Sequence, residues 1–205
     1  MFMPKNVIFI HGANATQRSF NYMLRAIKQI KRKDLQVHFF NYDHHHGFAH
    51  NFPVMLEKLD AIQGECLIVA HSMGGIYAMH LYGARPDRVK RAVTMATPFA
   101  GVHNAMFMRW VFPWYKLISD SAPTSNAVAK LNDIHVTIPW TQIVSMDGDQ
   151  PWVTVFTRND GVVSRLSMTS RKDVNYIYLD TNHYEILSDQ TSIDVVLSEL
   201  EYLVA

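Results

Sequence analysis

The sequence predicts an α/β fold, a three-layer α/β/α sandwich around a mostly parallel, doubly wound sheet. Short apolar stretches rich in β-branched residues recur along the chain, and segments with apolar residues at helical spacing separate them. This alternation is typical of parallel strands joined by right-handed crossovers. With 205 residues, 48% of them hydrophobic, the chain is long enough for a single domain with a substantial core.

The first half of the chain alternates regularly between predicted strands and helices. Strands are expected at residues 7–10, 37–40, 65–70 and 89–95. Helices are expected between them, each with its apolar residues on one stripe, at residues 20–30, 51–62 and 73–82. Pro53 is expected near the start of the second helix and Gly64 just past its end.

Residues 99–138 interrupt this rhythm, which the last part of the chain resumes. Strands are expected at residues 140–146, 153–157 and 175–179. The terminal helix has one apolar stripe, formed by Ile193, Val196, Leu197, Leu200 and Leu203. We therefore expect one domain over residues 1–205, with an insert at residues 99–138.

Composition excludes several classes of protein. The net charge of +1 gives no basic surface for nucleic acid, so no nucleic-acid partner is expected. The single cysteine, Cys66, lies in a predicted apolar strand, where we expect it to be a small buried hydrophobic residue. Neither a signal peptide nor an apolar run of about 18 residues is evident. We expect a soluble, cytoplasmic protein.

The most informative segment is a buried strand that turns sharply into a helix. The apolar stretch 66–69 leads to Ala70, Ser72 stands at the corner, and Gly74 follows. Residues two positions before and after the corner need small side chains, and Ala70 and Gly74 meet that need. A serine held in such a turn is a candidate nucleophile.

Polar residues follow four of the predicted strands, at the edge of the sheet where functional groups of α/β proteins gather. They are residues 11–14, Ser72, residues 159–162 and residues 181–183. Along the chain, Ser72, Asp160 and His183 come in the order serine, aspartate, histidine.

Five motifs together carry a resemblance to a known family. They are Phe-Ile-His-Gly at 9–12, Ala-His-Ser-Met-Gly-Gly at 70–75, Thr-Pro-Phe-Ala-Gly at 97–101, Asn-Asp-Gly-Val-Val at 159–163 and Asn-His at 182–183. Over nearly its whole length the chain resembles the α/β-hydrolases, in particular the compact lipases and esterases with this serine turn. The resemblance implies a reduced number of strands and no cofactor.

The resemblance makes Ser72 the nucleophile, His183 the base and Asp160 the acid that orients the base. A serine hydroxyl needs an adjacent base, which an imidazole can provide in both half-reactions. A carboxylate on the other ring nitrogen selects the tautomer and stabilises the imidazolium. The backbone N–H groups of Met73 and Ala13 are expected to hold the oxyanion, with Asn14 as the alternative to Ala13 and a candidate substrate-binding residue.

Other residues compete for these roles. Asp147 and Asp149 also follow a predicted strand and are the alternatives to Asp160. Among the other histidines, His80 falls within a helix, and His103 and His135 fall within the insert. His11 and His71 flank the motifs and are expected to brace the loops through local hydrogen bonds.

A histidine-rich run at residues 43–46, with His50 nearby, has ligand types that suit zinc. Adjacent side chains diverge along a backbone, and no second ligand pair stands at a regular spacing. We therefore expect a solvated loop near the rim of the site and no metal.

The insert contains an unusual concentration of large apolar side chains at residues 106–115. They could form a cap with an apolar pocket for acyl chains, in which Phe107, Trp110 and Trp114 are the candidate substrate-binding residues. The alternatives are packing on the body of the domain and a weak, shallow contact with a membrane interface.

These interpretations predict a serine esterase or lipase that acts on small-molecule or lipid esters through an acyl-enzyme intermediate. A thioesterase or amidase with the same three residues is one alternative. A noncatalytic binding protein that keeps the fold is the other.

Overall fold

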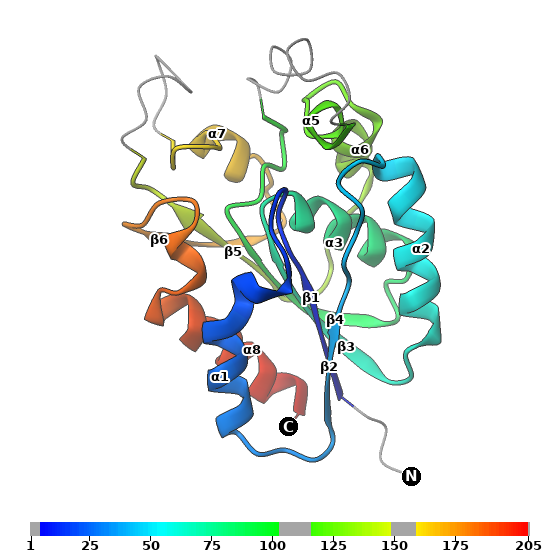
Figure 1. Ribbon diagram of the computed structural model, residues 1–205, viewed down its shortest axis with the longest axis vertical. Helices are drawn as coiled ribbons and strands as arrows, with labels where there is room; N and C mark the ends of the chain where they lie inside the picture. Colours follow the sequence, from blue (N-terminus) through cyan, green and yellow to red (C-terminus); the bar gives the residue numbers. More distant parts are fainter. Residues whose placement is uncertain (1–4, 103–115, 149–158, 205) are drawn as a thin grey trace.

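A six-stranded sheet forms the centre of the computed structural model, which describes residues 5–102, 116–148 and 159–204 (Figure 1). The strand order is β2-β1-β3-β4-β5-β6, and all neighbouring strands pair in parallel. The strands are β1 (Lys5–Ile10), β2 (Leu35–Phe39), β3 (Glu65–His71), β4 (Val89–Met95), β5 (Trp140–Ser145) and β6 (Asn175–Leu179). All carboxyl ends therefore lie at one edge of the sheet.

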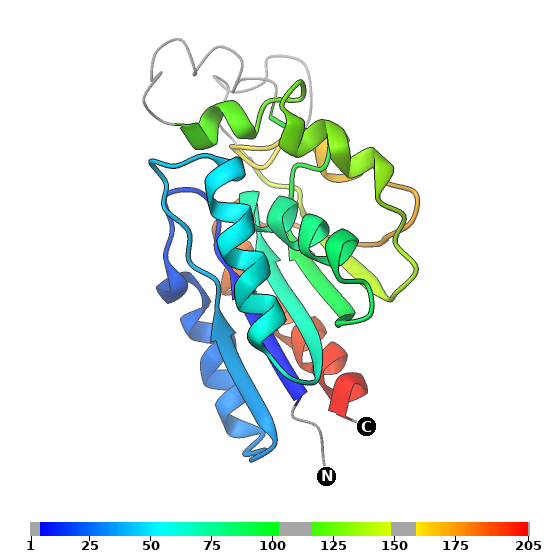
Figure 2. The same cartoon turned by 90° about the vertical axis from the view of Figure 1, so that its right-hand side faces the viewer.

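Four longer helices form the outer layers. Helices α1 (Asn21–Gln29) and α8 (Gln190–Val204) cover one face of the sheet, and α2 (Phe48–Ala61) and α3 (Met73–Ala84) cover the other (Figures 1 and 2). The short helical segments are η1 (Gln17–Phe20), α5 (Lys116–Asp120), α6 (Asn126–Ala129), η2 (Lys130–Asp133), α7 (Arg165–Met168) and η3 (Glu185–Leu187). This arrangement confirms the predicted α/β/α sandwich.

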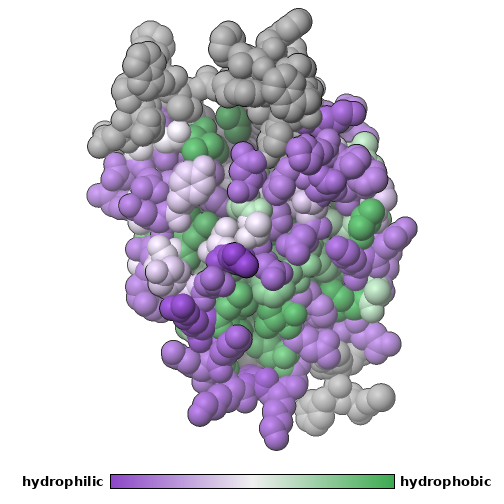
Figure 3. All heavy atoms as spheres, in the orientation of Figure 1, coloured by the Kyte–Doolittle hydropathy of each residue, from purple (hydrophilic) through white to green (hydrophobic). Residues whose placement is uncertain are grey.

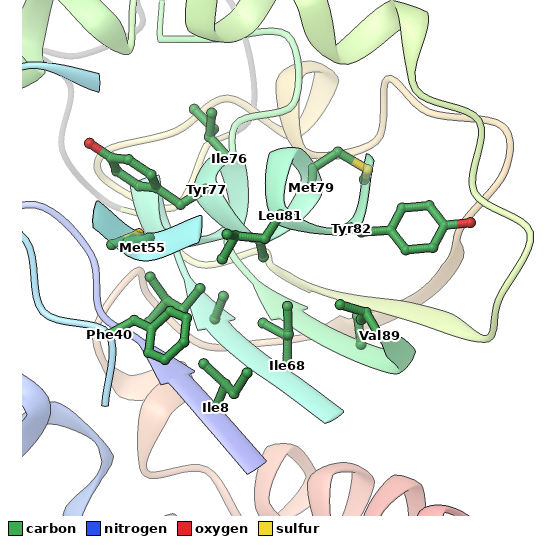
Figure 4. Close-up of a cluster of buried hydrophobic side chains, with 14 of the residues drawn as sticks. Ile8, Phe40, Met55, Ile68, Ile76, Tyr77, Met79, Leu81, Tyr82 and Val89 are labelled. Carbon is green, nitrogen blue, oxygen red and sulfur yellow. The ribbon is translucent and has the colours of Figure 1, made fainter. Parts of the chain in front are cut away.

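Each face of the sheet has its own hydrophobic core, because successive strand side chains point to opposite faces. In β1, Ile8 and Ile10 pack with the α2 and α3 side chains, whereas Val7 and Phe9 pack on the α1 and α8 side. Figure 4 shows the first of these cores, in which side chains of α3 stand over those of β1 and β3. Strands buried on both faces explain why these segments are apolar without alternation.

The predicted elements among the described residues lie within a few residues of the observed ones, but Pro53 does not lie at the start of α2 as expected. The helix begins at Phe48, so Pro53 is an interior residue rather than part of the first turn. The Phe48 N–H donates to Asp120 Oδ2 at 2.6 Å, and the Phe48 ring stacks on Phe52 and Tyr77. These tertiary contacts offset the hydrogen bond that a proline removes from a helix. The strand predicted at 153–157 lies outside the described residues.

Helices α5 and α6 of the insert lie beyond the carboxyl ends of the strands, on the α2 and α3 side (Figures 1 and 2). The residues after η2 run back beside α3 to the start of β5, and Ile134 packs against Gly83 near the end of α3. Asp120 of α5 accepts the Phe48 hydrogen bond at the start of α2, and His80 Nε2 of α3 donates to the Ala127 carbonyl at 2.7 Å. The second half of the insert is thus fastened to the body of the domain. Its role as a cap, and the extent of 99–138, stay predictions.

Strand β2 forms one edge of the sheet, and its surface is comparatively apolar. Val37 of β2 is 38% exposed. In Figure 3 apolar side chains gather at the centre of the face where β2 lies between α1 and α2, and polar side chains surround them.

In the described ranges, none of the helices combines the length and the apolar character needed to cross a bilayer.

A leucine of helix α8 can be used to test the packing of the core on the α1 and α8 face of the sheet. Leu200 is 1% exposed and packs in this core, whereas Leu166 of α7 is 70% exposed. Removing a buried leucine side chain loses its transfer free energy and leaves a cavity. We expect Leu200→Ala to lower the free energy of unfolding by about 2–5 kcal/mol and Leu166→Ala by less than about 0.5 kcal/mol in urea denaturation. Equal losses in the two variants would contradict this packing of α8.

Candidate active site

Ser72 stands at the turn between β3 and α3, in a strained backbone conformation. Its φ is 52° and its ψ is −124°, in a region that residues other than glycine rarely occupy. The Ser72 N–H donates to the Met95 carbonyl at 2.8 Å, which ties the turn to β4. Ser72 is the N-cap of α3, but its side chain makes no capping hydrogen bond. The hydroxyl is therefore left to interact with other groups.

Two glycines allow α3 to start this close to the sheet. A Cβ atom on Gly74 would lie 2.3 Å from the Ile10 carbonyl oxygen, and one on Gly75 would lie 1.9 Å from Thr97 Oγ1. Any larger residue would push the first turn of α3 away from the ends of β1 and β4. Of the two small residues that the sequence pattern requires, Gly74 is thus explained by its contact with the end of β1.

His183 brings its imidazole to Ser72 from the loop after β6. The distance from His183 Nε2 to Ser72 Oγ is 3.0 Å, and both side chains are buried. Nδ1 of the same ring donates to Asp160 Oδ2 at 2.7 Å. The proton on Nδ1 leaves Nε2 as the acceptor for the serine hydroxyl.

The Asp160 carboxylate is held by four hydrogen-bond donors. Oδ1 accepts from the N–H groups of Val162 and Val163 at 3.0 and 2.7 Å, and Oδ2 accepts from Ser145 Oγ at 2.5 Å as well as from His183. Burial alone would raise the pKa of Asp160, but the bonds from His183, Ser145 and Val163 outweigh burial and lower it. Asp160 is therefore ionised and faces His183 as a carboxylate.

The structure thus brings together the three residues that the sequence places far apart. Ser72 comes from the end of β3, Asp160 from the loop before α7 and His183 from the loop after β6. Such a chain can accept the serine proton on imidazole and stabilise the imidazolium with a buried carboxylate.

The first turn of α3 and the loop after β1 flank Ser72. Met73 is the first residue of α3, where backbone N–H groups have no acceptor within the helix. Gly12 packs on Ser72, and a Cβ atom there would lie 3.0 Å from Ser72 Cβ. Ala13 and Asn14 follow Gly12 in an exposed turn, with Asn14 at a φ of 55°. The predicted oxyanion donors thus belong to two segments that adjoin the serine.

The alternative acid and base candidates that the structure describes lie outside the hydrogen-bonded chain of Ser72, His183 and Asp160. Asp147 is exposed and its backbone pairs with Thr181, whereas Asp160 is buried against His183. His80 donates to the Ala127 carbonyl, and His135 is exposed. The remaining candidates lie outside the described residues: Asp149, His103 and the three proposed substrate-binding side chains Phe107, Trp110 and Trp114.

In the histidine-rich loop, Asp43 is used within the loop itself. Its carboxylate accepts from the His45 N–H and from His46 Nδ1, both at 2.8 Å. Within the described ranges no three histidine, cysteine, aspartate or glutamate side chains are arranged to hold a metal ion.

Two residues of the site differ from what the sequence predicts. Ser145, the last residue of β5, donates to Asp160, and its position at a strand's carboxyl end was the available signal. His71 was expected to make a local hydrogen bond. Instead its Nε2 donates to the His183 carbonyl, 112 residues away, at 2.8 Å. His11 Nδ1 does bond locally, to the Gly12 carbonyl at 2.9 Å.

The chain is similar in sequence to a known lipase. The Mus musculus sn-1-specific diacylglycerol lipase ABHD11 is 31% identical over 96 residues, which are 43% of this chain and 31% of that protein. The chain therefore matches less than a third of this relative's length.

Similar solved structures share the fold at low sequence identity. The Bacillus licheniformis lipase BlEst2 has a TM-score of 0.71 at 15% identity, covering 97% of this chain and 92% of that one. A metagenomic carboxyl esterase, MGS0156, has a TM-score of 0.68 at 12% identity, covering 97% and 74%.

The family model described as the alpha/beta hydrolase family matches residues 7–178, which is most of the chain and includes Ser72 and Asp160. Together with the parallel sheet and its helical layers, this match shows that the chain belongs to the alpha/beta hydrolase family.

Proposed function

We propose that the protein is a serine hydrolase that cleaves carboxylic esters through an acyl-enzyme intermediate. The observation that carries this proposal is the hydrogen-bonded chain from Ser72 Oγ through the His183 ring to the Asp160 carboxylate. The backbone strain at Ser72 supports it, because strain of this kind persists where the surrounding structure maintains it for function.

In the first half-reaction, Ser72 Oγ attacks the carbonyl carbon of the ester while its proton moves to His183 Nε2. The carbonyl oxygen becomes an oxyanion, which the N–H groups of Met73 and Ala13 stabilise. Asp160 stabilises the positive charge on His183. As the tetrahedral intermediate collapses, the bond to the alcohol oxygen breaks and His183 returns the proton to that oxygen.

In the second half-reaction, water replaces the alcohol. His183 takes a proton from water, whose oxygen attacks the acyl carbon, and the same oxyanion site holds the second tetrahedral intermediate. The bond to Ser72 Oγ then breaks, His183 gives the proton back to Ser72, and the carboxylic acid leaves. The cycle needs no cofactor.

The relatives support an ester as the substrate class. The Mus musculus relative is named as a diacylglycerol lipase, and the two structural neighbours are named as a lipase and a carboxyl esterase. We therefore propose a small-molecule or lipid ester, with Phe107, Trp110 and Trp114 of the insert as the acyl-binding side chains and Asn14 near the oxyanion site. A weak contact between the insert and a membrane interface belongs to the same proposal.

Hydrolysis of p-nitrophenyl esters of graded acyl length tests the reaction class. We expect turnover by the wild type and a loss of kcat of at least roughly 10⁴-fold in Ser72→Ala, because the nucleophile is removed. Ser188→Ala, a change at an exposed serine, is the matched control and should keep wild-type rates. The length profile reports how long an acyl chain the enzyme accepts.

Other outcomes of this assay point elsewhere. Turnover that survives in Ser72→Ala would remove Ser72 from its proposed role. Absence of turnover with every ester, together with cleavage of thioesters or amides, would favour the thioesterase or amidase alternative. A folded protein inactive on all three classes would favour a binding protein.

Substitution of the two aspartates tests the assignment of the acid. Asp160→Asn replaces the buried carboxylate that accepts the His183 Nδ1 proton, so it disfavours the required tautomer and the imidazolium. We expect kcat for a p-nitrophenyl ester to fall on the order of 10³–10⁴-fold in Asp160→Asn. Asp147→Asn, at an exposed position, should stay within about twofold. The opposite ranking would assign the acid role to Asp147.

A further inference from the structure

His71 precedes the candidate nucleophile and lies between the turn at Ser72 and the loop that carries His183. It is the last residue of β3, and its side chain is 2% exposed. The His71 and His183 rings lie 4.8 Å apart between centroids, at an angle of 54°. This buried histidine takes no part in the proton transfers between Ser72, His183 and the substrate.

One hydrogen bond determines the tautomer of His71. Its Nε2 lies 2.8 Å from the backbone carbonyl oxygen of His183, and a carbonyl can only accept. Nε2 therefore carries the proton and donates it to that carbonyl. The other nitrogen, Nδ1, is buried and has no hydrogen-bond partner among the described residues.

The surroundings of Nδ1 keep His71 neutral. A Cβ atom on Gly12 would lie 2.8 Å from Nδ1, so the backbone of Gly12 lies against this nitrogen. Protonation would place a buried N–H without an acceptor beside His183. Burial, followed by repulsion from His183, lowers the pKa of His71 to about 3. A neutral His71 does not oppose the positive charge that His183 acquires during turnover.

The backbone of His183 is held on both sides. Its N–H donates to the Asp160 carbonyl at 3.1 Å, and its own carbonyl accepts from His71 Nε2. The loop that carries the base is thus tied through its main chain to the segments of the acid and of the nucleophile. These two bonds are separate from the side-chain bonds of His183 to Asp160 and Ser72.

We propose that His71 is a positioning residue, whose neutral imidazole fastens the His183 backbone to the serine turn and so holds His183 Nε2 within reach of Ser72 Oγ. The inference rests on the proposed function, since it assigns His71 to the same reaction. A group displaced by about 1 Å can slow a reaction on the order of 100-fold, so a tether of this kind affects the rate more than substrate binding.

Three substitutions separate the hydrogen bond from simple packing. In glutamine the amide nitrogen is as many bonds from Cα as Nε2 is in histidine, so His71→Gln can keep the donor. In His71→Asn the donor is one bond too short, and His71→Leu has none. We expect kcat for a p-nitrophenyl ester to fall about 10- to 100-fold in His71→Asn and His71→Leu, with KM within about threefold of wild type. His71→Gln should stay within about fivefold in kcat.

Proton NMR supplies a readout independent of turnover. The His183 Nδ1–H that donates to Asp160 should give a low-field resonance in the wild type and in His71→Gln. We expect this resonance to be broadened by exchange in His71→Asn and His71→Leu. Thermal unfolding accompanies each variant, and if His71→Leu does not fold, the comparison of His71→Gln with His71→Asn decides.

The two proposals fail in different ways. An inactive wild type would contradict the proposed function, whereas the resonance in the same variants would still test the tether. Equal kcat losses in His71→Gln and His71→Asn, or an unchanged resonance in His71→Asn, would contradict the role of His71. A rise in KM without a change in kcat would also overturn it.

Discussion

The geometry of the whole site follows from the close approach of the first turn of α3 to the carboxyl end of β1. Gly74 makes it possible, because a side chain there would overlap the carbonyl of Ile10. At this turn Ser72 has a positive φ, and the N-terminus of α3 begins directly after it. The packed apolar cores on both faces of the sheet hold this strained turn, so the stability of the sandwich and the geometry of the site are coupled.

The parallel sheet brings the residues of the site together around this turn. Parallel strands bring all their carboxyl ends to one edge, and residues separated by more than a hundred positions meet there. The buried Asp160 carboxylate keeps its charge because four donors surround it, and the base loop is held by main-chain bonds as well as by its side chain. At Asp160, hydrogen bonds thus compensate a buried charge for the lost solvent.

Much of this architecture could be predicted from the sequence, because it depends on local pattern. Strands buried on both faces appear as continuous apolar runs, and the small residues around Ser72 mark the turn. What could not be predicted depends on tertiary contacts. The early start of α2 depends on Asp120, which comes from a distant segment, and the bond from His71 to the His183 carbonyl has no counterpart in any local pattern. Ser145 stands at the carboxyl end of a strand, but its bond to Asp160 becomes evident only when the fold places the two residues together.

Covalent labelling examines directly whether His183 activates Ser72 as a nucleophile. The purified protein is treated with a serine-directed phosphonate, and the adduct is located by mass spectrometry of the intact chain and its peptides. We expect one adduct, on Ser72, formed by the wild type but not by Ser72→Ala, and formed far more slowly by His183→Ala. A folded wild type that remains unlabelled, or an adduct on another serine, would contradict it.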